Sequence, residues 1–543
     1  MSQKNEGALL EIPFSLSLIV LLFLLSSVVS SVLSPNIQRS FEYTAYWFVV
    51  FLILMLFYNM RTKQTMKIIF HGVIILGCIF SLYSVFLKYL LPETWTILIP
   101  QHMFQYIADP FKTHNPLGIF LLLPLSMLLP SWTEKNKKKE RIVFVVLFGF
   151  LVFSYTRAAY ATFALITCFF VMFEIFIKRR RLTKRVYILL GSLVILSILL
   201  SFVIAWFENG PEWYVKIHDF FVEILRMPRY KGFISARNHF GLQAIYGILE
   251  KPWFGWGPDN LFYASIKYTP IIKLTTNVSE NLFLDIFAEQ GIVGGVLFFI
   301  ILGLMFLRSF IAVKRSDNVL DQRYFLAFTA ILILMMGDTI KRNYVYFMLF
   351  FVLGSFIYRE RQNIKTHFNI FLFPSIILFV FIFLKVNSQF FFSIGRPLFA
   401  QSIYPLNEEV YPTIIYESYK KNDVEAQQRW TDTYLHFFPG DQQALIVAGN
   451  TYMNFDKPQA LHYYLKAYEV SPLKEFELVT TIYYLKKEIE GKSSAKDFLF
   501  SHIDTYLLSK QWAKDHKYRN SSREGNIMYI CVEEGFDCRF VYK

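Results

Sequence analysis

Apolar runs alternate with short polar loops along most of the chain, and this pattern predicts a polytopic membrane protein. A helix of about 20 apolar residues crosses the hydrocarbon core of a bilayer. We interpret eleven apolar runs as spans, at residues 12–33, 43–59, 67–90, 115–131, 142–154, 158–177, 186–207, 286–307, 324–340, 344–358 and 368–388. The expected fold is all-α, a bundle of about eleven transmembrane helices.

The loops between these runs divide into a basic set and a nearly neutral set. The loops at 60–67, 132–141, 178–185, 308–323 and 359–366 hold 21 lysines and arginines together, whereas those at 34–42, 91–114, 155–157 and 338–343 hold 5. Basic loops stay in the cytoplasm. One consistent threading follows, with the N-terminus inside the cell and the long loop and C-terminal tail outside it.

This threading divides the chain into four parts. Residues 1–207 carry transmembrane helices 1–7, residues 208–285 form a long extracytoplasmic loop, residues 286–388 carry helices 8–11, and residues 389–543 form an extracytoplasmic tail. A loop of this length is usually functional. Its segment Asn238–Leu249 is expected to be a short amphipathic helix.

The tail has the character of a soluble helical module. Small residues, an aromatic residue and a proline follow one another as in a tetratricopeptide helix pair, at Ala448, Ala460, Tyr464, Ala467 and Pro472. Phe438-Pro439 ends a preceding unit, so the two prolines are separated by close to one period of that repeat. The alternative is an ordinary helical hairpin. Stacks of such repeats usually build concave surfaces that bind a protein partner.

Composition agrees with a membrane protein, since 55% of the residues are hydrophobic and 18% are charged. The net charge of +14 comes mostly from the cytoplasmic loops, so no nucleic-acid partner is expected. We interpret Cys78 and Cys168, which lie in spans, as packing residues. Cys531 and Cys538 could form a disulfide or remain two thiols. No Cys/His cluster has zinc spacing, and no cofactor or metal is expected.

Three polar segments stand at the outer ends of the predicted spans, where ionisable groups are costly and usually functional. They are the turn Ser154–Tyr160 with Arg157, the loop from Ile234 with Arg237 and the run Pro252–Gly257, and the segment from Asn277 with Glu280. Each has a plainer alternative: Arg157 could snorkel to the interface, Pro252–Gly257 could be only a turn, and Glu280 could cap a helix.

In this order, the three segments resemble the O-antigen ligase and O-antigen polymerase superfamily of bacterial membrane glycosyltransferases, which includes O-oligosaccharyltransferases. Asn115, at the entry to the fourth span, also matches the pattern. The last segment matches at Asn281, Leu284, Glu289, Gly291 and Gly294. The resemblance covers roughly residues 1–388. One position departs from it, because Glu280 stands where the family usually has a histidine.

The resemblance implies transfer of a glycan from an undecaprenyl-diphosphate carrier to an acceptor hydroxyl at the outer face of the bacterial inner membrane. Glu280 is the expected base or acceptor-orienting group, and Arg157 and Arg237 are the expected clamps of the diphosphate. Further substrate-binding residues are expected at Arg229, Lys231, His239, Asn281 and Asn115.

Other functions remain open at this point. The glycan acceptor could be a growing polysaccharide, a lipid or a protein. A polysaccharide or lipid exporter would have a similar number of spans, but it should show inverted repeats, and the sequence has no clear internal symmetry. The loop aromatics, among them Trp253, Trp256, Phe262 and Tyr263, would suit sugar faces or lipid chains, or could anchor the loop in the interface.

Overall fold

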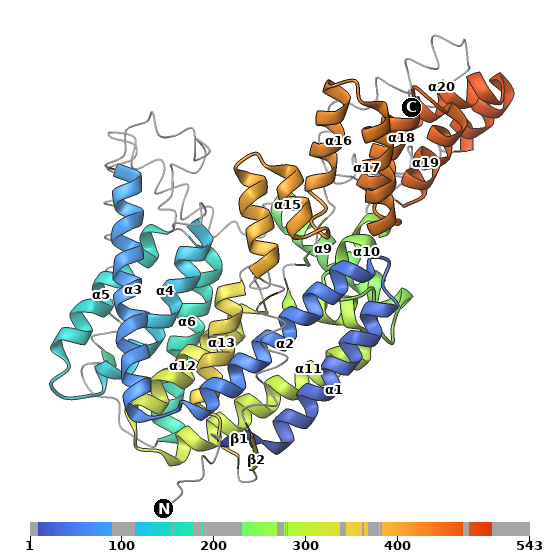
Figure 1. Ribbon diagram of the computed structural model, residues 1–543. Helices are drawn as coiled ribbons and strands as arrows, with labels where there is room; N and C mark the ends of the chain where they lie inside the picture. Colours follow the sequence, from blue (N-terminus) through green and yellow to red (C-terminus); the bar gives the residue numbers. More distant parts are fainter. Residues whose placement is uncertain are drawn as a thin grey trace, which may run out of the picture.

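The computed structural model is a helical membrane bundle that carries a helical tail at one end (Figure 1). It describes residues 9–89, 114–154, 156–178, 186–187, 191, 231–268, 276, 278–279, 281–336, 344–360, 363–367, 380, 383–470 and 477–501. Figure 1 shows α3–α6 on one side of the bundle, α1, α2 and α11 on the other, and α12 and α13 between them.

The bundle helices follow the predicted apolar runs closely. They are α1 (Phe14–Val32), α2 (Ile37–Asn59), α3 (Lys63–Tyr89), α4 (His114–Leu128) with a 3-10 turn η3 (Leu129–Trp132), α5 (Lys138–Phe153), α6 (Arg157–Met172) with a π-helical turn η4 (Phe173–Ile177), α11 (Leu282–Arg315), α12 (Val319–Leu334) and α13 (Tyr344–Ile357). Their core is largely aromatic: the buried Trp47 ring lies 5.1 Å from the rings of both Phe23 and Phe347. Such pairs add stability beyond the area they bury.

Five of the described helices are long and apolar enough to cross a membrane, and two shorter apolar helices accompany them. The five are Phe14–Val32, Ile37–Asn59, Lys63–Ser84, Ala158–Ile177 and Leu282–Arg315. Predicted span 186–207 and most of 368–388 lie outside the described residues. The protein is thus a multi-pass helical membrane protein, whereas the count of eleven spans stays a prediction. Cys168 is exposed rather than packed in the core, which corrects the interpretation above.

One two-stranded ribbon departs from the all-α expectation. Strand β1 (Leu9–Pro13) pairs antiparallel with β2 (Asn363–His367), with Leu9 opposite His367 and Pro13 opposite Asn363. The pairing joins the segment before α1 to the segment after α13, so it brings two of the predicted cytoplasmic regions together. Sequence periodicity did not reveal it, because nearly the whole membrane part of the chain lies between the two strands.

Other basic loops meet at the same end of the bundle as the ribbon. Arg61 donates to the Tyr358 carbonyl at 3.0 Å. Arg323, which is almost fully buried, contacts the carboxylates of Glu134 at 3.0 Å and Glu140 at 2.5 Å. The grouping of basic loops at one end is the arrangement that the charge pattern predicted, and assigning this end to the cytoplasm rests on the positive-inside rule.

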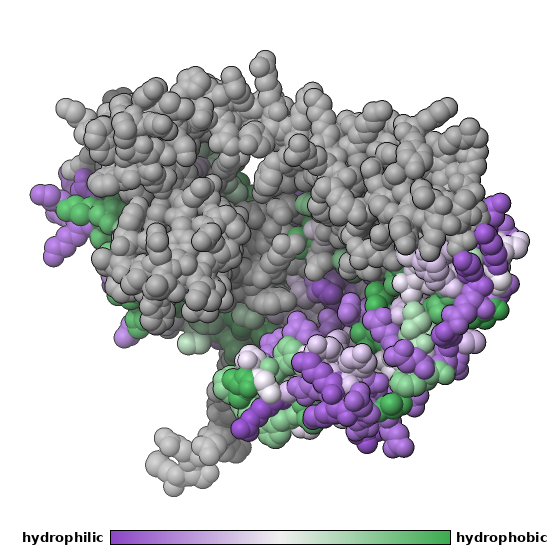
Figure 2. All heavy atoms as spheres, turned by 90° about the horizontal axis from the view of Figure 1, so that it is seen from above, coloured by the Kyte–Doolittle hydropathy of each residue, from purple (hydrophilic) through white to green (hydrophobic). Residues whose placement is uncertain are grey.

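The opposite end carries α9 (Lys231–Glu250), α10 (Leu261–Tyr268) and the tail. After a helix at 383–393, the tail contains α15 (Pro397–Ile403), α16 (Val410–Lys420), α17 (Val424–Phe437), α18 (Gln442–Tyr452), α19 (Lys457–Val470) and α20 (Glu477–Ile489). Seen from above, the described part of the tail shows many hydrophilic residues with hydrophobic ones scattered among them (Figure 2).

The tail helices form hairpins with a regular spacing. The length of chain from the start of α16 to the start of α18 nearly equals that from the start of α17 to the start of α19. Ala448, Ala460 and Ala467 are fully buried where these helices meet, and Tyr464 is 2% exposed. Small residues allow close helix contact, as the sequence suggested, and the tetratricopeptide assignment stays a prediction. Pro472 lies outside the described residues.

Candidate functional site

The long helix α11 is broken at Gly291, and the loop segment Pro252–Gly257 is docked into the break. Gly291 has φ 68° and ψ −171°, which lies outside the helical region. On the N-terminal side of the break, the amides of Trp256 and Gly257 donate to the carbonyls of Ala288 at 3.0 Å and Glu289 at 2.7 Å. The loop therefore satisfies carbonyls that the interrupted helix leaves without a helical donor.

The loop also receives hydrogen bonds from the second half of α11. The amide of Ile292 donates to the Pro252 carbonyl at 2.7 Å, and that of Val293 donates to the Trp253 carbonyl at 3.3 Å. Backbone groups buried in a membrane protein need such partners. The segment Pro252–Gly257, which could have been only a turn, thus exchanges backbone hydrogen bonds with a membrane helix on both sides of its break.

Glycine is required on both sides of this contact. A Cβ on Gly291 would lie 2.2 Å from the Trp253 carbonyl oxygen, and one on Gly255, whose φ is +69°, would lie 2.4 Å from the Glu289 carbonyl carbon. Both positions have backbone conformations that L side chains rarely adopt. The two glycine-containing motifs that carry the family resemblance therefore form a single contact.

A row of buried serines on α1 holds the contact from the other side. The Ser30 hydroxyl lies 2.5 Å from the Phe254 carbonyl oxygen and 2.9 Å from that of Glu289. The Ser27 hydroxyl donates to the Gln290 side chain at 2.5 Å. These contacts explain why an otherwise apolar helix carries fully buried serines.

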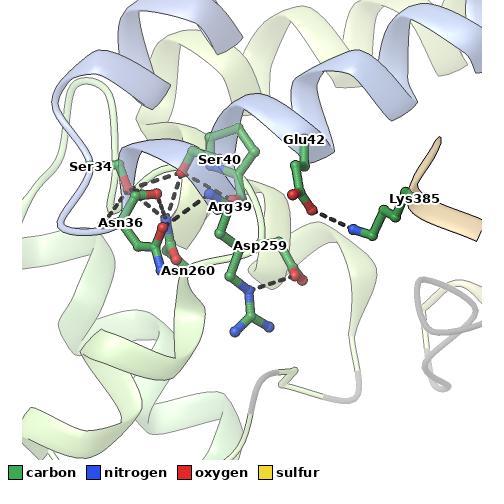
Figure 3. Close-up of polar contacts among 9 residues, drawn as sticks. Ser34, Asn36, Arg39, Ser40, Glu42, Asp259, Asn260 and Lys385 are labelled. Carbon is green, nitrogen blue, oxygen red and sulfur yellow. Dashed lines mark hydrogen bonds and ion pairs between the residues drawn. The ribbon is translucent and has the colours of Figure 1, made fainter. Parts of the chain in front are cut away.

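The turn between α1 and α2 binds the loop just after the docked segment. The Asn260 side-chain amide donates to the hydroxyls of Ser34 at 2.5 Å and Ser40 at 2.6 Å, and Arg39 pairs with Asp259 at 2.9 Å (Figure 3). Asn260 is fully buried. The first two membrane helices, the long loop and α11 therefore form one connected unit at the end of the bundle opposite the basic loops.

The first turn of α11 is capped by Asn281. Its side-chain oxygen accepts from the amides of Phe283 at 3.0 Å and Leu284 at 3.2 Å, and its side-chain nitrogen donates to the Met336 carbonyl at 3.1 Å. The capping alternative for Glu280 is therefore wrong, because α11 begins at Leu282 and Asn281 is its cap. Glu280 itself, which precedes this cap in the sequence, lies outside the described residues.

Arg157 is the first residue of α6, directly after the turn that the sequence singled out. A Cβ on Gly118 of α4 would lie 2.4 Å from the Thr156 hydroxyl and 2.9 Å from that of Ser154. This close approach brings the start of α4, where Asn115 is the second residue, beside the turn that precedes Arg157. Two motifs that belong to different membrane helices thus meet at the end of the bundle opposite the basic loops.

Helix α9 carries three more of the predicted residues, Lys231, Arg237 and His239. It begins at Lys231, earlier than the predicted helix, so Arg237 lies in its second turn rather than at its start. The helix packs against α10 and α11. Arg229 lies outside the described residues, and His239 is half-buried.

Four large apolar residues of α9 face away from the protein. Leu242, Ile245, Tyr246 and Leu249 are 41–69% exposed, whereas the polar Gln243 is fully buried and accepts from the Ser265 hydroxyl at 2.8 Å. Apolar residues at this spacing form one helix stripe. A helix with such a stripe at the end of a membrane bundle suits the bilayer interface.

The two loop tryptophans have different environments. Trp253 is 66% exposed, whereas Trp256 is 8% exposed and donates from its ring nitrogen to the Gly247 carbonyl at 3.0 Å. The sugar or lipid contact considered for Trp256 is therefore wrong, because the ring fills a small core between α9, α10 and α11. Trp253 remains available for an interfacial role.

Two carboxylates of α11 are fully buried, Asp285 and Glu289. Asp285 accepts from the Ser279 amide at 2.6 Å and so holds the segment before the helix. This contact with the backbone beside Glu280 gives Asp285 an observed structural role. Among the described residues, no group of three or more His, Cys, Asp or Glu side chains could hold a metal ion.

Comparison with known proteins agrees with this arrangement. No curated protein matches the chain. The family model described as O-Antigen ligase matches residues 142–299, from α5 through the break in α11. The match supports the resemblance read from the sequence: through this central region the chain is similar to the O-antigen ligase family.

Proposed function

We propose that the protein transfers glycan units from an undecaprenyl-diphosphate-linked donor to an acceptor hydroxyl at the outer face of the cytoplasmic membrane. The match of residues 142–299 to the O-antigen ligase family supports a membrane glycan-transfer role in general. The observation that carries the proposal further is the docked contact at Gly291, because it ties α9, with Arg237, to the start of α11 beside Glu280.

In this reaction the bond between the sugar's anomeric carbon and the phosphate oxygen breaks, and a bond to the acceptor oxygen forms. Undecaprenyl diphosphate leaves with the bonding electrons, so cations are needed where its charge develops. Arg157 and Arg237 take this role, and Arg229 and Lys231 assist. The guanidinium group suits it because it binds phosphate oxygens in a bidentate manner.

The acceptor hydroxyl loses its proton in the same step. Glu280 accepts this proton and becomes neutral. The adjoining N-terminus of α11 favours the ionised carboxylate that the reaction needs beforehand. His239, Asn281 and Asn115 bind the substrates around this centre. The exposed apolar stripe of α9 would place this helix, with Arg237, at the bilayer interface. This position supports a donor that arrives along the membrane plane.

The test is transfer in membranes supplied with lipid-linked donor. We expect Arg157→Ala and Arg237→Ala each to lower turnover by about 10²–10³-fold, the usual worth of one charge-stabilising group. Lysine at either position should restore only part of the activity, because it lacks the bidentate fork. Arg141→Ala, at the other end of the bundle, is the matched control. Full transfer by both alanine variants at normal abundance would disprove the diphosphate clamp.

A further inference from the structure

A cavity of about 550 Å³ lies between the outer end of the membrane bundle and the beginning of the tail. One wall is the first half of α2, and the facing wall is the helix at 383–393. The segment 404–409, which leads into α16, lines the tail side, and Asp259 connects the cavity to the loop that follows the docked segment. Parts of the chain that are distant in sequence therefore build it.

Direct contacts hold these walls together. Glu42 of α2 pairs with Lys385 and accepts from the Tyr404 hydroxyl (Figure 3 shows the Glu42–Lys385 pair). The Gln38 side chain donates to the Leu406 carbonyl at 3.4 Å. Because the membrane part and the tail contact each other here through side chains, the cavity is a built feature.

The charges in the cavity are predominantly negative. Both of its cations are already paired, Arg39 with Asp259 and Lys385 with Glu42. The further carboxylates of Glu408 and Glu409 leave an excess of negative charge. Burial raises the pKa of Glu408 and nearby Asp441 adds to this rise, whereas Arg39 opposes it. A diphosphate or another anion would be repelled, so the ligand chemistry differs from that of the arginine clamp.

The remaining lining is suited to hydroxyl groups and sugar rings. Tyr43, Tyr46 and Tyr404 supply aromatic faces. Side-chain amides come from Asn36, Gln38, Gln389 and Asn407. Carboxylates and amides accept hydrogen bonds from hydroxyls, and aromatic rings pack against apolar faces. This combination fits an uncharged ligand with many hydroxyls, and the volume fits a small oligosaccharide.

We propose that this cavity binds an uncharged, hydroxyl-rich segment of the glycan chain and holds it between the membrane bundle and the tail. The identity of the ligand as a glycan rests on the proposed function. The site is separate from the residues assigned to the chemistry. Its role is to retain the chain that accepts the next unit or has just been extended, so it should affect product length more than the chemical step.

Binding can be measured without catalysis, on the full chain in lipid nanodiscs. The probe is the lipid-free oligosaccharide released by mild acid from the surface glycan of the source strain, titrated by calorimetry. Ala45→Trp fills the cavity from α2 and Gln389→Trp narrows it from the opposite, exposed position. We expect each to weaken binding at least tenfold. Phe41→Trp, on α2 but outside the cavity, is the matched control and should bind like the wild type.

The outcomes separate this proposal from the proposed function. Arg237→Ala should lose transfer and keep oligosaccharide binding. If it keeps transfer, the proposed chemistry fails, and the binding result is still decided by the cavity variants. Unchanged affinity in both Ala45→Trp and Gln389→Trp would overturn the cavity proposal even if transfer is confirmed. In transfer assays the two cavity variants should give shorter products; a shift confined to the affinity for the donor would contradict the role assigned to the acceptor chain.

Discussion

Replacing Gly291 by alanine tests whether the docked loop holds the break in α11. The backbone at φ 68° and ψ −171° lies in a region that is essentially restricted to glycine. A side chain there costs about 1–3 kcal/mol in strain. The new Cβ would also lie 2.2 Å from the Trp253 carbonyl oxygen, so the loop must move away.

The movement should break at least the two shortest backbone hydrogen bonds of the contact, both 2.7 Å, from Gly257 to Glu289 and from Ile292 to Pro252. Each contributes about 0.5–1.5 kcal/mol. Together with the strain, the local structure should lose about 2–6 kcal/mol. Since 1.4 kcal/mol is a tenfold change in an equilibrium, opening of the loop should become at least about 25-fold more frequent.

Hydrogen–deuterium exchange on the protein in nanodiscs measures this opening directly. The amides of Trp256 and Gly257 should exchange at least about 25-fold faster in Gly291→Ala than in the wild type. Gly303→Ala is the matched control, because it lies in the same helix and its Cβ would meet no atom within 4 Å. Equal protection of the loop in Gly291→Ala and Gly303→Ala would refute the account of the break.

Three further predictions concern topology, the tail and the base. Tags in loop 208–285 and after Lys543 should report outside and a tag near Lys138 inside; a cytoplasmic C-terminus would contradict the assignment. Deleting 410–543 should leave a stable membrane part and change acceptor choice or product length, and identical products would make the tail only structural. Glu280→Gln should lower turnover by about 10²–10⁴-fold, and Glu280→His should keep some activity with a higher pH optimum; near-normal transfer by the Gln variant would exclude the base.

The course of the membrane helices could be predicted from the sequence because burial in lipid depends on local composition. Predicted spans 12–33 and 158–177 correspond to α1 and to α6 with η4. The ends of α9 and α11 were placed less well. Asn281 and Glu280 are both plausible caps in the sequence, and the hydrogen bonds from the Phe283 and Leu284 amides to the Asn281 side chain identify Asn281 as the cap. The Asn281 side chain also donates to the Met336 carbonyl just after α12, a contact that the local sequence does not reveal.

The candidate site shows a sharper limit to sequence reasoning. Gly255 and Gly291 could be recognised as parts of two motifs, but each motif alone is compatible with an ordinary turn or a flexible helix. Their meaning lies in the pairing, since each glycine leaves room for the backbone of the other segment. The serines of α1 were a signal that could have been used, because buried hydroxyls need acceptors, and those of Ser27 and Ser30 find acceptors outside their own helix. Glycines leave neighbouring backbone carbonyls accessible, and the acceptors of Ser30 are carbonyls close to Gly255 and Gly291, those of Phe254 and Glu289. Unexplained polar residues in an apolar helix, taken together with unexplained glycines elsewhere, thus indicate where a membrane helix is interrupted.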